Sequence, residues 1–300
     1  MTPVSVSGPD DTGRISRAEP AAYAVLEREL QIGREIQAGF LPEHLPVPPG
    51  WELEAEFRPA RQVAGDFYDV FDLSVSQRTA VIVADVCDKG VGAALFMALI
   101  RTLLRHTVET GGLHAMSTVG WDPRDGLPGV GEAPLLHAVN STNRYLTRVH
   151  RQQGYFATLF FGILDAASGS LSYINGGHNP PLHVGADGRL LGELAPTGPA
   201  VGVLHGADFR VGRVRLGLGE SLFLFTDGVT DCRSSGGEFF GEQRLIDLAT
   251  VPAPSARAQI ERIVRAMEDH GRDGEQHDDI TLLVLRRTAG TPITVRNSSS

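Results

Sequence analysis

The chain has 300 residues, of which 42% are hydrophobic and 21% are charged, and these proportions are typical of a soluble globular protein with a sizeable core. Its net charge of −9 and the lack of a long basic cluster argue against nucleic acid as a partner. Two cysteines exclude a disulfide framework, the N-terminus has no secretory signal pattern, and we find no apolar run of the ~20 residues that a membrane span needs. We therefore expect a cytoplasmic protein without membrane contact.

Four segments are predicted along the chain. Residues 1–20 and 289–300 have the polar composition of disordered tails. Residues 21–42 are predicted to be an amphipathic linker helix that ends before Leu41-Pro42. This helix either packs on its own domain or, through residues 21–40, forms a homodimer. Residues 43–288 are predicted to form one domain, in which the Gly- and Pro-rich stretch 111–134 is a flexible insertion.

Short strands dominate the predicted domain, and many of them are joined by hairpins. Apolar runs and alternation predict strands at 51–57, 63–71, 80–84, 156–164, 171–174, 182–184, 221–225 and 280–285. Helical spacing predicts helices at 93–108, 135–150, 241–249 and 255–270. This pattern favours an α+β domain of antiparallel sheets with flanking helices.

The stretch from Ala80 to Leu95 combines a buried strand, a charged turn and the start of a helix. Asp85, Asp88 and Lys89 directly follow the apolar run. A charged group at the end of a buried strand is costly unless it is paired, and a divalent cation is an efficient partner. The alternative is a solvated acidic turn, which is the commoner use of such residues.

Three further acidic sites also adjoin apolar strands: Asp66, Asp227 with Asp231, and Asp278-Asp279. If the sheets bring these strand ends together, so many carboxylates stay ionised only when cations neutralise them. Oxygen donors without His or Cys clusters favour Mg²⁺ or Mn²⁺ over zinc. Two such ions could activate a water for in-line attack on phosphorus, which predicts a two-metal phosphoryl hydrolase. The alternative is that these aspartates cap turns and helices.

Four motifs resemble, in order, the metal motifs of the PPM metal-dependent protein phosphatases (type 2C-like), and of their bacterial SpoIIE/RsbU branch in particular. They are Gly65-Asp66-Phe67-Tyr68-Asp69, Ala84-Asp85-Val86-Cys87-Asp88-Lys89-Gly90, Phe225-Thr226-Asp227-Gly228-Val229-Thr230-Asp231 and Asp278-Asp279-Ile280-Thr281. Residues 156–162 and 175–181, and the lead-in Arg34-Glu35-Ile36-Gln37, also resemble that branch. The likeness spans about residues 24–287.

The resemblance implies a β-sandwich of two antiparallel sheets in a four-layer αββα arrangement, with two Mn²⁺ or Mg²⁺ ions at one end. The ligands that it implies are Asp85 as the bridge between the ions, the backbone carbonyl of Val86, the side chains of Asp227 and Asp278, Asp66 through bound water, and Asp231 at a weaker third ion. Within this set, Asp85 and Asp227 are the expected catalytic residues, with metal-bound water as the nucleophile.

The substrate that the resemblance implies is phosphoserine or phosphothreonine on a protein. In this branch it is typically a STAS-type anti-anti-sigma factor in partner-switching signalling, which regulates a sigma factor. One alternative is a weakened or inactive PPM fold that acts as a regulatory binding module, although no metal aspartate is missing here. Another is a nuclease or phosphodiesterase, which would need a basic groove that this acidic chain does not show.

Several residues depart from the family pattern or have an open role. Asp88 stands where the branch usually has Gly, and it contacts a metal, distorts the loop or points to solvent. Cys87 occupies the place of a His in animal members, so the proton donor is unassigned. Arg61 binds the substrate phosphate or is an exposed structural arginine. Cys87 and Cys232 are expected to be inert rather than redox-active, and His178 to be structural.

Overall fold

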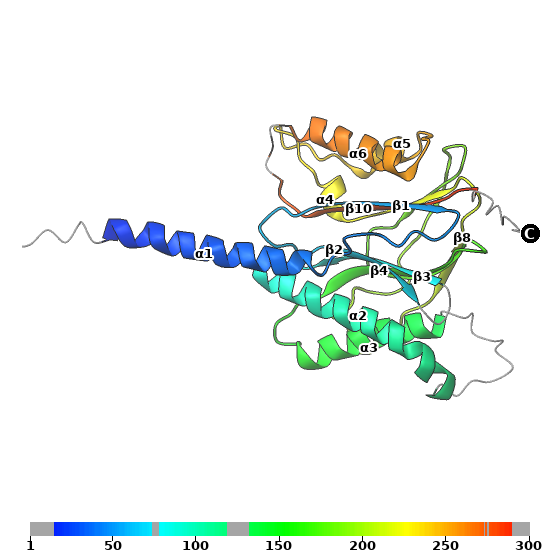
Figure 1. Ribbon diagram of the computed structural model, residues 1–300, viewed down its shortest axis with the longest axis horizontal. Coiled ribbons are helices and arrows are strands. Elements are labelled where there is room, and N and C mark those ends of the chain that lie inside the picture. Colours follow the sequence, from blue (N-terminus) through cyan, green and yellow to red (C-terminus); the bar gives the residue numbers. More distant parts are fainter. Residues whose placement is uncertain (1–14, 74–77, 119–131, 273, 275, 290–300) are drawn as a thin grey trace, which may run out of the picture.

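A computed structural model describes residues 15–73, 78–118, 132–272, 274 and 276–289, and shows two five-stranded antiparallel sheets packed face to face (Figure 1). The first, here called the β10 sheet, has the strand order β1 (Trp51–Arg58), β10 (Ile280–Arg287), β9 (Ser221–Phe225), β6 (Leu182–Val184) and β7 (Leu190–Glu193). The second, here called the β3 sheet, has the order β2 (Phe67–Leu73), β3 (Arg78–Val86), β4 (Ala157–Asp165), β5 (Ser170–Gly176) and β8 (Gly212–Arg215).

Helices cover the outer face of each sheet. Helices α2 (Val91–Thr118) and α3 (Glu132–Val149) lie on the β3 sheet, whereas α5 (Glu242–Ala249) and α6 (Ala256–His270) lie on the β10 sheet (Figure 1). The one-turn helix α4 (Asp227–Thr230) follows β9. The predicted four-layer α+β sandwich is therefore confirmed.

Strand β3 shows how the layers are held together. Ile82 and Ala84 face the core under α2 and α3, while Val81 and Val83 face the core between the sheets, and all four side chains are fully buried. Each large apolar side chain that is removed from water contributes about 1.5–3 kcal/mol. The uninterrupted apolar run in the sequence thus follows from burial of β3 on both faces.

Two helices are longer than predicted. Helix α1 (Ile15–Ala38) includes residues 15–20, which the sequence placed in a tail, and its N-terminal half projects beyond the sandwich (Figure 1). Helix α2 continues to Thr118 and α3 begins at Glu132, so both ends of the predicted insertion 111–134 are helical. A glycine in a helix costs only about 1 kcal/mol, which continued backbone hydrogen bonding outweighs. Residues 1–14, 119–131 and 290–300 lie outside the described residues.

Strand β2 begins at Phe67, so residues 63–66 of the predicted strand 63–71 form a loop instead. The reason is that backbone groups of this loop bond to the side chains of Gln37 and Asp279 rather than to a neighbouring strand. Strand β8 and helix α4 were not predicted, because four residues are too few to show a period.

The expectation that no segment is long and apolar enough to span a membrane was wrong. Val91–Thr110 within α2 is long enough and apolar enough, judged by its length and composition alone. Three charged residues, Arg101, Arg105 and Glu109, interrupt this stretch. Its fully or almost fully buried residues pack against the β3 sheet: Ala93, Met97, Ile100, Leu104 and Val108. In this structure α2 is therefore a core helix of the sandwich.

Candidate metal centre

The acidic strand ends meet because of the strand register. Phe67 at the start of β2 pairs with Ala84 near the end of β3, so Asp66 and Asp85 lie at the same end of that sheet. In the β10 sheet, Phe225 at the end of β9 pairs with Leu282 near the start of β10, which brings Asp227 close to Asp278. Face-to-face packing then joins the two ends into one cluster.

Asp66 links the sheets directly. Its carboxylate oxygen Oδ2 accepts hydrogen bonds from Thr226 Oγ1 (2.7 Å) and Thr281 Oγ1 (2.8 Å), both of which belong to the β10 side of the sandwich. The Asp66 side chain is only 2% exposed. Burial, and then the nearby charge of Asp85, raise the pKa of Asp66 well above its ordinary value, although the two hydroxyls oppose this.

Asp85 lies among like charges. Burial, followed by the charges of Asp227 and Asp278, raises the pKa of Asp85 to about 7, while a hydrogen bond with Asp66 acts in the opposite direction. The pKa of Asp227 is also raised, first by burial and then by Asp278 and Asp231. These mutual effects show that the carboxylates are close enough to repel one another.

Asp279 holds the loop that carries Asp66. Its Oδ1 accepts from Ala60 N (2.7 Å) and its Oδ2 from Gly65 N (2.8 Å). Gly65 approaches the end of β3 so closely that a Cβ there would lie 2.8 Å from the carbonyl oxygen of Val86. A larger residue at position 65 would therefore displace the loop from the carbonyl that the sequence proposes as a ligand.

Other predicted site residues lie at the edge of the cluster. Asp231 is exposed at the end of α4, and its backbone N donates to Asp227 O. Arg61 is also exposed, and its guanidinium lies next to Gly90. Asp88 is exposed and its carboxylate accepts from Lys89 N (2.8 Å).

The donors suit a hard divalent cation. They are carboxylate and carbonyl oxygens that converge at one end of the sandwich, which is the chemistry that Mg²⁺ and Mn²⁺ prefer. Within the residues that the structure describes, however, no three acidic, His or Cys side chains are already arranged as ligands of one ion. The oxygens have protein partners instead: hydroxyls at Asp66, and the ammonium of Lys89 at 2.8 Å from Asp278. The residues fit the metals by donor type and by position.

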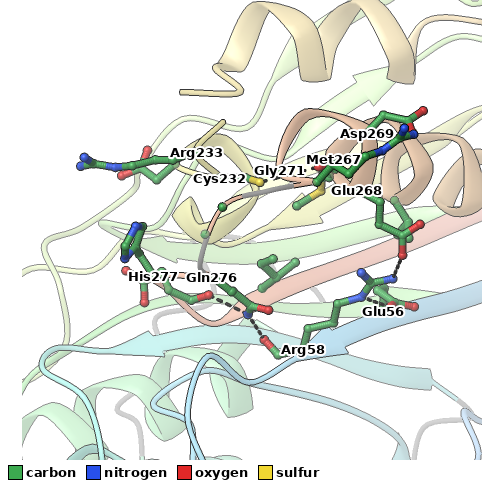
Figure 2. A pocket seen from close by; sticks show the side chains of 17 residues that line it. Glu56, Arg58, Cys232, Arg233, Met267, Glu268, Asp269, Gly271, Gln276 and His277 are labelled. Carbon is green, nitrogen blue, oxygen red and sulfur yellow. Dashed lines mark hydrogen bonds and ion pairs between the residues drawn. The ribbon is translucent and has the colours of Figure 1, made fainter. Parts of the chain in front are cut away.

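A cavity of about 530 Å³ opens beside the cluster, and Asp231 and Asp278 line both. Figure 2 shows residues that line this cavity, among which Arg58 forms ion pairs with Glu56 (2.6 Å) and Glu268 (2.8 Å).

The remaining sequence candidates have structural surroundings. Burial raises the pKa of the thiols of Cys87 and Cys232, which does not favour a reactive thiolate. His178 is 2% exposed, and its Nδ1 lies 2.8 Å from Thr158 Oγ1. Burial lowers the pKa of His178 to about 4, so this imidazole is neutral at pH 7.

Four residues that lie in the quoted motifs support the cluster, a role that the sequence did not reveal: Gln37, Thr226, Asp279 and Thr281. Gln37 binds the backbone of Ala64 through two hydrogen bonds, from its Nε2 to Ala64 O (2.7 Å) and from Ala64 N to its Oε1 (2.9 Å). The available signal was that Thr226 and Thr281 lie within two residues of an aspartate at a strand end, but the contacts join residues far apart in the chain.

Solved structures share this fold. The SiaA-PP2C domain of Pseudomonas aeruginosa matches with a TM-score of 0.69 and 21% identity over 89% of this chain and 98% of that chain. The RsbU and RsbW domains of Rv1364c from Mycobacterium tuberculosis match with a TM-score of 0.62 and 30% identity, over 83% of this chain and 64% of that chain. The fold is that of the PP2C-type protein phosphatases.

Sequence comparisons identify the family within the PP2C-type phosphatases to which the chain belongs. The family model described as Stage II sporulation protein E matches residues 76–288. Protein IcfG of Synechocystis is 41% identical over 277 residues, which cover 90% of this chain but 43% of IcfG. The phosphoserine phosphatase RsbU of Bacillus subtilis is 27% identical over 264 residues, covering 87% of this chain and 71% of RsbU. The chain belongs to the SpoIIE family, and it spans less than half the length of IcfG.

Proposed function

We propose that the chain is a Mn²⁺- or Mg²⁺-dependent phosphatase of phosphoserine and phosphothreonine in proteins. The observation that carries this proposal is the convergence of Asp66, Asp85, Asp227 and Asp278 from both sheets at one end of the sandwich. Family membership supports it, as does the similarity to RsbU, a phosphoserine phosphatase.

The chain's own residues divide the work in this proposal. Asp85, Asp227, Asp278 and the carbonyl of Val86 would hold two ions, Asp66 would orient a water, and Asp231 would hold a weaker third ion. Divalent ions bound there would lower the pKa of a water and neutralise phosphoryl charge. The hydroxyl groups on Asp66 and the backbone hydrogen bonds to Asp279 keep these donors in place.

Hydrolysis of p-nitrophenyl phosphate tests the proposal. We expect activity with Mn²⁺ that EDTA abolishes and that falls at least ~100-fold in Asp85→Asn and Asp227→Asn, because each removes a charged ligand. Asp208→Asn, at an exposed aspartate paired with Arg210, is the matched control and should keep full activity. Full activity in metal-free protein would contradict the proposal. No activity with any metal would favour the alternative, a PPM-fold binding module.

The substrate we propose is a phosphorylated STAS-type anti-anti-sigma factor, in the cytoplasm and without nucleic acid or membrane as a partner. This rests on the SpoIIE/RsbU-like sequence and on the match to a structure that joins RsbU and RsbW domains. Asp85→Asn used as a substrate trap in a pull-down from cell extract should retain a phosphoprotein of this class. The pull-down is run at saturating Mn²⁺, so that Asp85→Asn is loaded despite its weaker metal binding. Retention of the same proteins after Mn²⁺ is replaced by EDTA would contradict recognition at the metal centre.

A further inference from the structure

Lys89 forms an ion pair with Asp278, which is one of the predicted metal ligands. Its ammonium Nζ lies 2.8 Å from Asp278 Oδ2 and 2.5 Å from the carbonyl oxygen of His277. The other carboxylate oxygen, Asp278 Oδ1, accepts from Asp279 N at 3.0 Å. Both oxygens of Asp278 therefore already have partners within the protein.

The turn before α2 places Lys89 there. Asp88 has a φ of +71° and is the non-glycine residue with positive φ in the described part of the chain, and Gly90 follows with a φ of +86°. The Asp88 carboxylate accepts from Lys89 N, and Ala94 N donates to Gly90 O, which anchors the turn to the first turn of the helix. Asp and Asn tolerate this left-handed conformation better than other side chains do. The lysine thus extends from a defined turn between β3 and α2.

The Lys89–Asp278 ion pair is strong enough to form but exposed enough to be exchanged. The side chain of Lys89 is 31% exposed and that of Asp278 is 36% exposed, so water screens their attraction. Of the predicted side-chain ligands Asp66, Asp85, Asp227 and Asp278, only Asp278 forms an ion pair with a Lys or Arg within the described residues. A divalent ion has twice the charge of an ammonium and can take its place at the same carboxylate.

We propose that Lys89 is an internal cation that competes with the divalent metal for Asp278 and thereby weakens binding of the ion that Asp278 holds. The inference rests on the proposed metal centre and goes beyond it by giving Lys89 and Asp88 a role. Asp88 is then the residue that shapes the turn, and Lys89 sets the metal concentration at which the centre fills.

Calorimetric titration of the full chain with Mn²⁺ tests this inference without measuring hydrolysis. Lys89→Met removes the competing charge and keeps a similar length, so we expect one of the two ions to bind about tenfold more tightly. Lys89→Arg keeps the charge and should bind within about twofold of the wild type. Unchanged or weaker binding of both ions in Lys89→Met would overturn the inference.

A double-mutant cycle separates this effect from a general change in charge. In an Asp278→Asn background, where the ion pair is absent, Lys89→Met should no longer tighten Mn²⁺ binding. An equal gain in both backgrounds would contradict competition at Asp278.

If neither the wild type nor Lys89→Met binds Mn²⁺, the metal centre and the inference both fail. If only Lys89→Met binds it, the inference is supported. Retained p-nitrophenyl phosphate hydrolysis with unchanged affinity in Lys89→Met would sink the inference alone.

Discussion

Asp88 shows how one residue can depart from a family pattern and keep the local structure. The SpoIIE/RsbU branch usually has glycine here, which suits a φ of +71° at no cost. An aspartate pays for this backbone conformation partly through its own hydrogen bond to Lys89 N. The added charge is exposed to solvent, and its carboxylate accepts a hydrogen bond from Lys89 N. The structure thus gives no support to a weakened site at this position.

His178 provides a pH test at the scale of one residue. Burial lowers its pKa to about 4 from an ordinary value of 6.5. Between these values the unfolded chain binds more protons than the native one, so this residue's contribution to stability is complete above pH 6.5 and declines as the pH falls. From pH 7.5 to 5 we expect the wild type to lose about 2 kcal/mol more than His178→Gln.

Urea unfolding at both pH values measures the difference, because other groups shared by the two proteins cancel. Asp85, whose pKa is raised, changes stability in the opposite direction in both proteins. Parallel pH dependence of wild type and His178→Gln would show that His178 is not held neutral.

At the scale of elements, α4 must dock closely on the segment before β10. A Cβ at Gly228 would lie 1.9 Å from the carbonyl oxygen of Asp279, which is backbone and cannot turn away. We expect Gly228→Ala to reduce the free energy of unfolding by about 2–3 kcal/mol through overpacking. Gly192→Ala is the matched control, because a Cβ there meets nothing within 4 Å. Equal stability of both variants by urea unfolding would be inconsistent with this close approach.

Gln37 connects α1 to the metal-site loop. Its side-chain amide forms two buried hydrogen bonds with the backbone of Ala64, two residues before Asp66. Gln37→Ala would leave a buried N–H and C=O without partners, so we expect a loss of about 1–3 kcal/mol in stability and weaker Mn²⁺ binding. Gln31→Ala on the same helix removes only an exposed contact with Glu35 and should change neither. Urea unfolding measures the stability of the two variants, and calorimetry measures their affinity for Mn²⁺. Identical Mn²⁺ affinities of Gln37→Ala and Gln31→Ala would argue against coupling between α1 and the metal centre.

Sequence reasoning succeeded where one element carries its own signal. The apolar run of β3 predicted a strand buried on both faces, and each predicted strand next to an acidic site is present, with β2 starting later than predicted. It missed the contacts of Gln37 and Asp279, whose partners lie 27 and more than 200 residues away in the chain. Local composition does not distinguish a residue that holds the Asp66 loop from an ordinary polar residue, because the contact exists only after the sheets have packed.

For the whole molecule, the exposed stripe on α1 predicts self-association. Val25, Ile32 and Ile36 are 59%, 48% and 61% exposed and follow the seven- and four-residue spacing of a coiled-coil seam. We propose that two copies pair through this stripe, as the sequence suggested for residues 21–40. Light scattering at micromolar concentration should give a dimer for the wild type and a monomer for Ile32→Glu, with Arg34→Glu as the control. A monomeric wild type would contradict the proposal.

We propose that the acidic strand ends of both sheets form one two-metal centre with Asp85 between the ions. Calorimetric counting of Mn²⁺ tests it most directly, because it reports the metals themselves. We expect two ions per wild-type chain, and in Asp85→Asn a loss of affinity of at least ~100-fold for both, since a shared ligand is removed. Binding of two ions by Asp85→Asn with wild-type affinity, or of none by the wild type, would contradict it.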